Sequence, residues 1–273
     1  MLSKDIKNTA DRIRKDCIWM STRAGSGHLG PALSIAEILA VLYRGILSYD
    51  PNSPTWNERD RFILSKGHGC LALYSVLSQA GFFDRSLLND FCQRYGTLLS
   101  GHPEIKLPGV EANTGSLGHG IAIGMGMALA ARMDKRRTRV FVVTGDGELQ
   151  EGSNWEAAMS AAYYELDNLS VIIDRNRLQL GDFTKNISQL DPLEEKFRSF
   201  GWEVRVLDGH NIEELTSALM KIPFAKGKPT AVIANTIKGK GVKLAENKVE
   251  WHYKVLTRQQ YEELKEEMSL EEL

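Results

Sequence analysis

The chain has 273 residues, of which 42% are hydrophobic and 25% are charged, so it can bury a large core and has the composition of an ordinary globular protein. Its formal net charge is −1 at pH 7 and its isoelectric point is about 6.6. This balance gives no electrostatic basis for binding nucleic acid or an anionic membrane surface.

The cysteines and the N-terminus bear on the cellular compartment. Cys17, Cys70 and Cys92 have neither the spacing of a metal site nor the pattern of a disulfide framework, which favours a reducing compartment. Residues 1–16 are charged rather than apolar, so no signal peptide is expected. Apolar stretches are interrupted within about 15 residues, too soon for a membrane-spanning helix. We therefore predict a cytoplasmic protein that contacts no membrane.

The N-terminal third reads as helices around one short strand. Apolar residues recur at helical spacing over residues 3–20, which predicts an amphipathic helix. A loop is expected over residues 26–30 and a mostly buried helix over residues 34–47. Residues 61–64 read as a strand, and a helix is expected to follow from Gly67 to residue 80.

The remainder of the chain alternates strands and helices. Strands are predicted over residues 140–144, 169–174, 202–207 and 230–234, and helices over residues 120–133, 154–166, 212–220 and 258–273, the last one acidic. Residues 94–118 hold many Gly, Pro and Thr residues and predict a long structured loop, a kind that is usually functional. The alternation predicts an α/β fold with a mostly parallel sheet and helices on both faces, formed by residues 1–273 as a single domain.

Two polar residues follow two successive predicted strands. Asp146 lies between Gly145 and Gly147, and Asn176 comes thirty residues later. Because a helix-sized segment separates the strands, both loops should lie at the carboxyl edge of a parallel sheet, where α/β folds bind ligands. Carboxylate, amide and backbone carbonyl oxygens suit Mg²⁺ or Ca²⁺ held against a phosphate-bearing cofactor. The flanking glycines would let the backbone approach that cofactor closely.

Five of the six histidines directly follow a glycine, a position typical of bent loops. The histidines in four separate predicted loops are His28, His68, His102 and His252. If those loops converge, their imidazoles would line a polar pocket that binds hydroxyls or phosphate and moves protons. The alternative is that the Gly-His pairs are ordinary loop residues without a role in a ligand site. His119 and His210 carry less weight, and His210 reads as a turn residue.

Three further features allow more than one interpretation. Residues 25–30 match the dinucleotide-binding pattern G-x-G-x-x-G, but a helix rather than a strand is expected before them, which argues against NAD. Residues 115–120 could contact a flat ring or another subunit, or could simply begin a helix. Glu151 could be a solvated acid favoured by a helix dipole, or part of a catalytic proton network.

Together these motifs resemble the N-terminal, diphosphate-binding half of transketolase, a thiamine-diphosphate enzyme. The resemblance covers nearly the whole chain, in six motifs that keep the family's order: residues 26–30, 60–68, 101–104, 107–111, 114–118 and 145–152. It implies the thiamine-diphosphate-binding fold, with Mg²⁺ (or Ca²⁺) beside the cofactor. It also implies transfer of a two-carbon ketol unit from a ketose phosphate to an aldose phosphate.

The resemblance implies a role for each matching residue. The implied metal ligands are the side chains of Asp146 and Asn176 and the backbone carbonyl of Leu178. The implied cofactor-binding residues are His68, Gly115, Ser116, Leu117, Gly147, Asn176 and His252. The implied catalytic residues are His28, His102 and His252, which would face the sugar, and Glu151, at a subunit interface. Ser116 and His119 depart from the Pro and Gln common in full-length transketolases.

The family's second half has no counterpart in this sequence. That half normally supplies the glutamate that protonates the aminopyrimidine, together with most of the contacts to the sugar phosphate. We therefore expect the N-terminal subunit of a split transketolase, working with a separate C-terminal subunit in an α₂β₂ assembly. The sequence does not identify the donor and acceptor sugars. Pentose phosphates are the expected substrates, and branched sugar phosphates and sulfosugars are the alternatives.

Two other functions share parts of this pattern. The α subunit of a thiamine-dependent 2-oxo-acid dehydrogenase has the same metal motif and the same split arrangement. The Gly-His loops favour transketolase over it, since histidines suit polyhydroxy sugars. The other alternative is a non-catalytic cofactor-binding subunit that keeps the fold without turnover.

Overall fold

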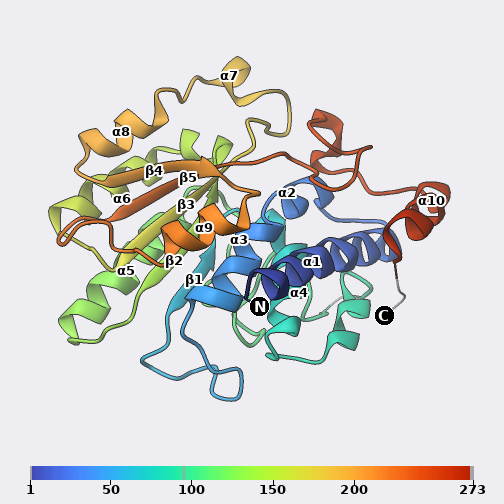
Figure 1. Ribbon diagram of the computed structural model, residues 1–273, viewed down its shortest axis with the longest axis horizontal. Coiled ribbons are helices and arrows are strands. Elements are labelled where there is room, and N and C mark those ends of the chain that lie inside the picture. The colour runs from blue at the N-terminus through green and yellow to red at the C-terminus, as the bar shows by residue number, and fades with distance from the viewer. Residues whose placement is uncertain (1, 95, 271–273) are drawn as a thin grey trace.

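The computed structural model describes residues 2–94 and 96–270, and within them five strands form one sheet in the order β1-β2-β3-β5-β4. The strands are β1 (Arg61–Leu64), β2 (Val140–Gly145), β3 (Leu169–Arg175), β4 (Glu203–Asp208) and β5 (Thr230–Asn235). Every pairing between neighbouring strands is parallel, so the predicted parallel α/β fold is confirmed. Figure 1 shows the sheet with helices around it.

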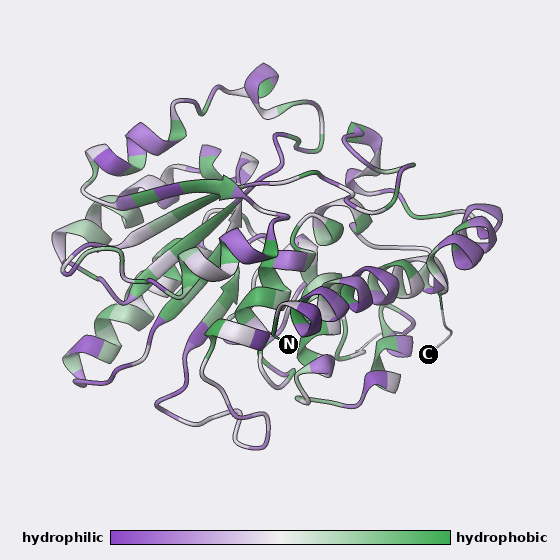
Figure 2. Cartoon of the chain, in the orientation of Figure 1, coloured by the Kyte–Doolittle hydropathy of each residue, from purple (hydrophilic) through white to green (hydrophobic). Residues whose placement is uncertain are grey.

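Strand side chains alternate between two hydrophobic cores, one on each face of the sheet. In β2, Val140 and Val142 belong to one core, whereas Phe141 and Val143 belong to the other. Successive side chains of a strand point to opposite faces, so a strand that is apolar throughout needs cover on both. Figure 2 shows the hydrophobic character of the central strands.

Different helices cover the two faces. The core that contains Val140 is completed by α5 (Gly120–Met133), α6 (Gly152–Tyr163) and α8 (Leu193–Ser199). The core that contains Phe141 is completed by α1 (Leu2–Ala24), α2 (Leu29–Leu33), α3 (Ala36–Val41), α4 (Cys70–Gln79), α9 (Ile212–Leu219) and α10 (Arg258–Met268). The predicted placement of helices on both faces is therefore confirmed.

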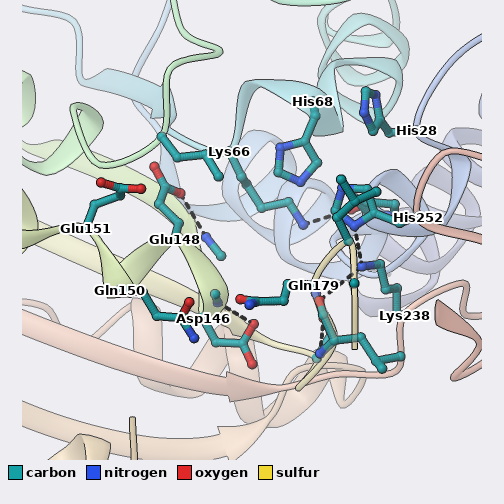
Figure 3. Close-up of a pocket in the computed structure, with 18 of the residues that line it drawn as sticks. His28, Lys66, His68, Asp146, Glu148, Gln150, Glu151, Gln179, Lys238 and His252 are labelled. Carbon is teal, nitrogen blue, oxygen red and sulfur yellow. Dashed lines mark hydrogen bonds between the residues drawn. The ribbon is translucent and has the colours of Figure 1, made fainter. Parts of the chain in front are cut away.

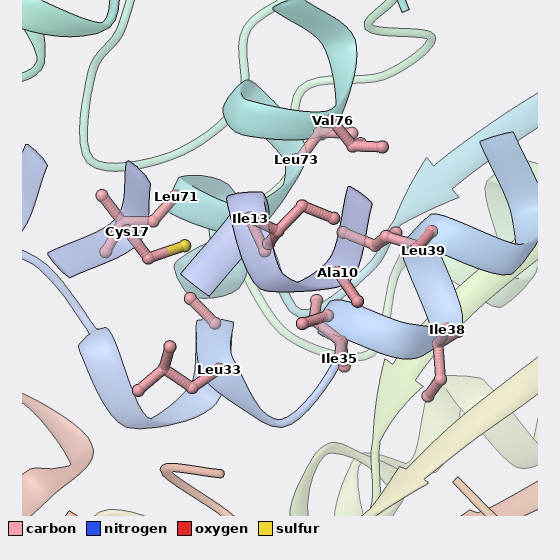
Figure 4. Close-up of a cluster of buried hydrophobic side chains, with 14 of the residues drawn as sticks. Ala10, Ile13, Cys17, Leu33, Ile35, Ile38, Leu39, Leu71, Leu73 and Val76 are labelled. Carbon is pink, nitrogen blue, oxygen red and sulfur yellow. The ribbon is translucent and has the colours of Figure 1, made fainter. Parts of the chain in front are cut away.

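Helix α1 is the centre of a helical layer beside the sheet. Its apolar residues recur every three or four positions, and Ala10, Ile13 and Cys17 are at most 1% exposed. Figure 4 shows these side chains packed among residues of α2, α3 and α4, such as Leu33 and Leu71. Truncating a buried Ile to Ala typically costs about 2–5 kcal/mol of the free energy of unfolding. This packing therefore holds the loop between α1 and α2 and the segment between β1 and α4 in position.

Two predicted boundaries between residues 26 and 47 are wrong. The loop expected over residues 26–30 ends at His28, because α2 begins at Leu29. A Cβ atom on Gly30 would lie 2.6 Å from the carbonyl oxygen of Trp251, so a distant segment presses on this turn. The helix expected over residues 34–47 is shorter, since α3 gives way to a π-helical turn, Leu42–Ile46.

Several short elements were not predicted. They are α7 (Thr184–Ile187), α8, and the 3₁₀ turns Gly67–Gly69, Arg85–Asp90, Gly147–Gln150 and Val249–His252. The expected acidic C-terminal helix is α10, which a capping box between Thr257 and Gln260 begins. Residues 271–273 of the expected range lie outside the described residues. No helix among the described residues is both long and apolar enough to cross a membrane.

Candidate active site

The carboxyl ends of β2 and β3 and the loops beside them enclose a cavity of about 410 Å³. This is the sheet edge at which the sequence predicts a ligand site. The predicted site residues that line the cavity are His28, His68, His102, Gly115, Leu117, Asp146, Gly147, Glu151, Asn176, Leu178 and His252. Ser116, the remaining predicted residue, is exposed. Figure 3 shows His28, His68 and His252 on one side of the cavity and Glu148 and Glu151 on the other.

Asp146 is a buried carboxylate that faces this cavity. Its side chain follows β2 directly, and the residue is 3% exposed. Its Oδ1 accepts a hydrogen bond from the Gly147 amide (2.8 Å) and its Oδ2 from the Arg177 amide (2.7 Å). Burial, followed by the charge of Asp174, raises the pKa of Asp146 to about 7. A nearby cation would offset both effects, so the site fits a bound metal ion.

Asn176 is oriented by a buried acid two residues before it. Its Nδ2 donates to Oδ2 of Asp174 (2.8 Å), while its Oδ1 accepts from the Leu178 amide (3.1 Å). The amide is therefore held with its nitrogen toward Asp174 and its oxygen toward the residues around Leu178. A metal ligand held by such a hydrogen bond keeps its oxygen in a fixed direction.

Asp174 is itself the centre of a buried polar cluster. Its carboxylate accepts hydrogen bonds from Ser34 Oγ (2.7 Å) and Thr236 Oγ1, and forms an ion pair with the Lys66 ammonium. The Asp174 and Lys66 side chains are 0% and 1% exposed. Burial acts to raise the pKa of Asp174, but Lys66 and the hydrogen bonds outweigh it and lower the pKa. The cluster joins the end of β3 to α2, β1 and β5.

Lys238 links the third implied metal ligand to a histidine. Its Nζ donates to the Leu178 carbonyl (3.0 Å) and to Nδ1 of His252 (2.7 Å), and the residue is 1% exposed. Burial, together with the charge of Lys66, lowers the pKa of Lys238 to about 7. The Leu178 carbonyl thus already accepts a hydrogen bond from the Lys238 side chain.

The structure brings the four predicted histidines together. The ring centroid of His28 lies 5.3 Å from that of His68, 5.5 Å from that of His252 and 6.3 Å from that of His102. Burial lowers the pKa of His28 to about 4 and that of His252 to about 3, and it lowers the pKa of His68 and His102 as well. Neutral imidazoles each offer one donor and one acceptor, which suits sugar hydroxyls.

The two glutamates on the opposite side differ in their surroundings. Glu148 is 3% exposed, and its carboxylate accepts from Ser65 Oγ (2.5 Å), Thr144 Oγ1 (2.6 Å) and the Gly118 amide (2.9 Å). It therefore ties the loop before α5 to the ends of β1 and β2. Glu151 is exposed at the N-cap of α6. It is the carboxylate on this side that is accessible to a second chain.

Two glycines allow unusually close approaches around the cavity. Gly115 has a φ of +152°, and a Cβ atom on it would lie 2.9 Å from Cδ2 of His102. A Cβ atom on Gly147 would lie 2.5 Å from Oε1 of Gln179. Gly115 therefore needs the absence of a side chain, whereas a side chain at position 147 would displace Gln179.

The donor set fits the hard cation that the sequence predicts. Asp146 and Asn176 offer carboxylate and amide oxygens, and Leu178 offers a backbone carbonyl, which are the groups that Mg²⁺ and Ca²⁺ prefer. Within the described part of the chain, no three His, Cys, Asp or Glu side chains form a metal-binding group. A transition-metal site built from such side chains is therefore not indicated here.

Several residues of the site were missed in the sequence: Lys66, Glu148, Asp174, Gln179 and Lys238. The role of Asp174 could have been predicted from the sequence, because an acidic residue at the end of an apolar strand is expected to be buried and to need a polar partner. His210 was expected to be a turn residue, and it does lie in a turn. Its ring, however, also bonds Oε2 of Glu37 (3.0 Å) and the Ile237 amide (2.8 Å), so it fixes the turn to α3.

Comparisons with known proteins agree with this geometry. Residues 6–272 match the family model described as the transketolase thiamine diphosphate binding domain. The chain is 42% identical over 260 residues to an apulose-4-phosphate transketolase subunit of Phocaeicola vulgatus, covering 95% of this chain and 92% of that one. It is 43% identical over 258 residues to a 6-deoxy-6-sulfo-D-fructose transketolase subunit of a Clostridium species, covering 94% of each.

Longer relatives match over part of their length. Human transketolase is 42% identical over 265 residues, which are 96% of this chain and 42% of the human protein. The crystal structure of transketolase from Campylobacter jejuni superposes with a TM-score of 0.89 at 32% identity, covering 99% of this chain and 43% of that chain. The chain therefore belongs to the transketolase family, in which it corresponds to the thiamine-diphosphate-binding domain.

Proposed function

We propose that this chain is the N-terminal, cofactor-binding subunit of a split transketolase. With a separate C-terminal subunit it would transfer a two-carbon ketol unit from a ketose phosphate to an aldose phosphate. The observation that carries the proposal is one cavity that joins neutral histidines to Asp146 and Asn176. The family membership and the two similar subunits described above support it.

Within this proposal, Mg²⁺ and the diphosphate lie at the ends of β2 and β3. Asp146, Asn176 and the Leu178 carbonyl would hold the metal ion, while Gly147 and Asn176 would contact the diphosphate. His68 and His252 would lie beside the diphosphate, and residues 115–117 would contact the aminopyrimidine. Thiamine diphosphate supplies, when bound, the nucleophilic carbon that breaks and forms carbon–carbon bonds.

The histidines would handle the sugar. His28, His102 and His252 are neutral near pH 7, because burial lowers their pKa values. Each ring can accept a proton from one hydroxyl and donate to another, and their convergence places such groups around one substrate. Lys238 Nζ and Nδ1 of His252 share a hydrogen bond, which orients that ring.

The partner subunit would cover the side of the cavity that carries Glu151. Beyond that acid, Met133, Met159 and Tyr163 on α5 and α6 are 75%, 50% and 81% exposed. Large exposed apolar side chains on adjacent helices are typical of a protein interface. We propose that the C-terminal subunit docks on this surface and that the assembly is α₂β₂.

The compartment and domain organisation are also proposals. Cys17, Cys70 and Cys92 are free cysteines, which fits a reducing compartment such as the cytoplasm. One sheet with a core on each face fits a single domain over residues 1–273. For the substrates we propose sugar phosphates; the names of the two similar subunits indicate a branched sugar phosphate for one and a sulfosugar for the other.

Two parallel activity assays separate the proposed reaction from the main alternative. The chain, its C-terminal partner, thiamine diphosphate and Mg²⁺ are incubated either with a ketose phosphate and an aldose phosphate, or with pyruvate and an electron acceptor. We expect ketol transfer in the first mixture and no oxidation in the second. Oxidative decarboxylation without ketol transfer would favour a subunit of a 2-oxo-acid dehydrogenase. If the cofactor-loaded complex is inactive in both mixtures, a non-catalytic role is favoured instead.

A further inference from the structure

Tyr253 lies beside the histidines but outside the set of residues assigned above. Its ring centroid is 4.6 Å from that of His28, and its hydroxyl is 3.2 Å from Oγ of Ser26. His28 lines the cavity, whereas Tyr253 is 58% exposed. Tyr253 therefore lies on the outer side of His28, at the edge of the cavity.

The segment that carries this ring packs against the start of α2. Tyr253 directly follows the 3₁₀ turn Val249–His252, and the carbonyl of Trp251 presses on Gly30, where a Cβ atom would lie 2.6 Å away. The turn is thus docked on the start of α2, which His28 precedes. Tyr253 and Ser26 connect the segment that carries His252 to the loop that carries His28. An aromatic ring with two fixed contacts loses little further freedom when a ligand binds.

We propose that Tyr253 is a specificity-determining residue, which selects the part of the sugar beyond the transferred two-carbon unit. The inference rests on the proposed function, since it takes the histidines as the place where the reacting carbons lie. We place the carbons beyond that unit at the edge of the cavity, where the rings of His28 and Tyr253 meet. The hydroxyls of Tyr253 and Ser26 offer uncharged hydrogen-bonding groups, which suit an unbranched chain of hydroxyl-bearing carbons. A branched carbon would meet the ring instead.

The exposure of Tyr253 makes this proposal testable without loss of the fold. Substitutions of exposed side chains usually change stability by less than about 0.5 kcal/mol. Tyr253→Gly removes the ring, Tyr253→Phe removes only the hydroxyl, and Ser26→Ala removes the partner of that hydroxyl. Thermal unfolding and thiamine diphosphate affinity of each variant show whether the fold and the cofactor site are intact.

The experiment compares a straight with a branched donor in the complex with the C-terminal subunit, thiamine diphosphate and Mg²⁺. Xylulose 5-phosphate is the straight donor and apulose 4-phosphate the branched one. We expect Tyr253→Gly to shift the ratio of their kcat/KM values toward the branched sugar by about fivefold, mainly through KM. Tyr253→Phe and Ser26→Ala should each shift it by about twofold. Equal losses of kcat for both donors, with an unchanged ratio, would overturn the inference.

A binding measurement separates this inference from the proposed function. The dissociation constants of both sugars are measured by calorimetry on the complex without Mg²⁺, so that no turnover is needed. If no ketol transfer occurs but the variants still shift the ratio of dissociation constants, the proposed function fails, and Tyr253 is shown to select sugars without reference to a transferred unit. If the complex is active but the variants change neither the ratio of kcat/KM values nor the ratio of dissociation constants, the inference fails and the proposed function stands.

Discussion

The Nζ atom of Lys238 lies 3.0 Å from the carbonyl oxygen of Leu178 and 2.7 Å from Nδ1 of His252. One buried lysine side chain therefore connects an oxygen that we assign to the metal site with a ring that we assign to the sugar. The two halves of the site are consequently coupled through a single side chain.

Replacing this side chain should change both halves together. In Lys238→Met we expect the affinity for thiamine diphosphate and Mg²⁺ to fall about tenfold, because the hydrogen bonds that hold the Leu178 carbonyl and the His252 ring are lost. The pKa of His252, which Lys238 helps to lower, should rise in the variant. Calorimetry measures the affinity and an NMR titration measures the imidazole.

The matched control for this change is Lys240→Met, in the same loop, whose side chain is 36% exposed and lies 4.0 Å from Glu246. It should leave the cofactor affinity and the titration of His252 unchanged. Equal effects of the two substitutions would show that net charge, rather than the position of Lys238, controls the site.

Asp146→Ala should remove the metal dependence of cofactor binding. The carboxylate is the only formally charged ligand in the proposed set, so we expect the affinity in Mg²⁺ to fall on the order of 100-fold. Calorimetry with and without Mg²⁺ measures the effect, and Asp182→Ala, at a half-buried aspartate near the cavity, serves as the control. Unchanged affinity in Asp146→Ala would exclude this residue from the metal site.

The buried pair of Lys66 and Asp174 should behave as a unit. Breaking it with Asp174→Asn leaves an uncompensated ammonium, which we expect to cost about 3–5 kcal/mol of the free energy of unfolding. Combining Asp174→Asn with Lys66→Met should cost less than the sum of the two single changes. Urea unfolding of the four proteins measures the coupling. Additive losses would mean that the pair does not stabilise the fold through its mutual attraction.

Acid should destabilise the cofactor-free protein through its buried histidines. The pKa of His28 is about 4 in the folded protein and about 6.5 when unfolded, so between these values the unfolded state binds more protons and stability falls as the pH falls. Asp146 acts in the opposite direction, because its folded pKa is raised to about 7. We therefore compare how the free energy of unfolding changes with pH in the wild type and in His28→Gln. The contribution of Asp146 is common to both proteins and cancels in the difference.

Between pH 7 and pH 5, the His28→Gln variant should lose less stability than the wild type. Urea unfolding at the two pH values gives this difference directly. If both proteins lose the same free energy over this interval, His28 is not held neutral by its surroundings and its assigned environment is wrong.

Much of the fold follows from local patterns in the sequence. The strand over residues 61–64 and the helix over residues 120–133 have the predicted bounds. Both segments have a clear apolar pattern, bounded by polar or glycine residues. Helix α8 was missed because its buried face consists of Leu193 and Phe197 alone, too few residues to define a period.

The site was only partly predictable, for a physical reason. Asp146 and Asn176 follow apolar strands, so their common edge could be inferred from the parallel topology. The contacts of Lys66 with Asp174 and of Lys238 with Leu178 join residues 108 and 60 positions apart. No local pattern encodes such pairs, since they arise only when the sheet and its loops are packed. The assigned roles of the site residues stay predictions.

The most direct test of the central claim is two-carbon transfer by the purified chain with and without its C-terminal partner, at saturating thiamine diphosphate and Mg²⁺. The account predicts no ketol transfer by the chain alone and transfer from xylulose 5-phosphate, or from one of the modified sugars, when the partner is added. Full activity of the chain alone would contradict the proposal that it needs a second polypeptide. Failure of the saturated complex with its matched partner to transfer any ketol unit would contradict the proposed function itself.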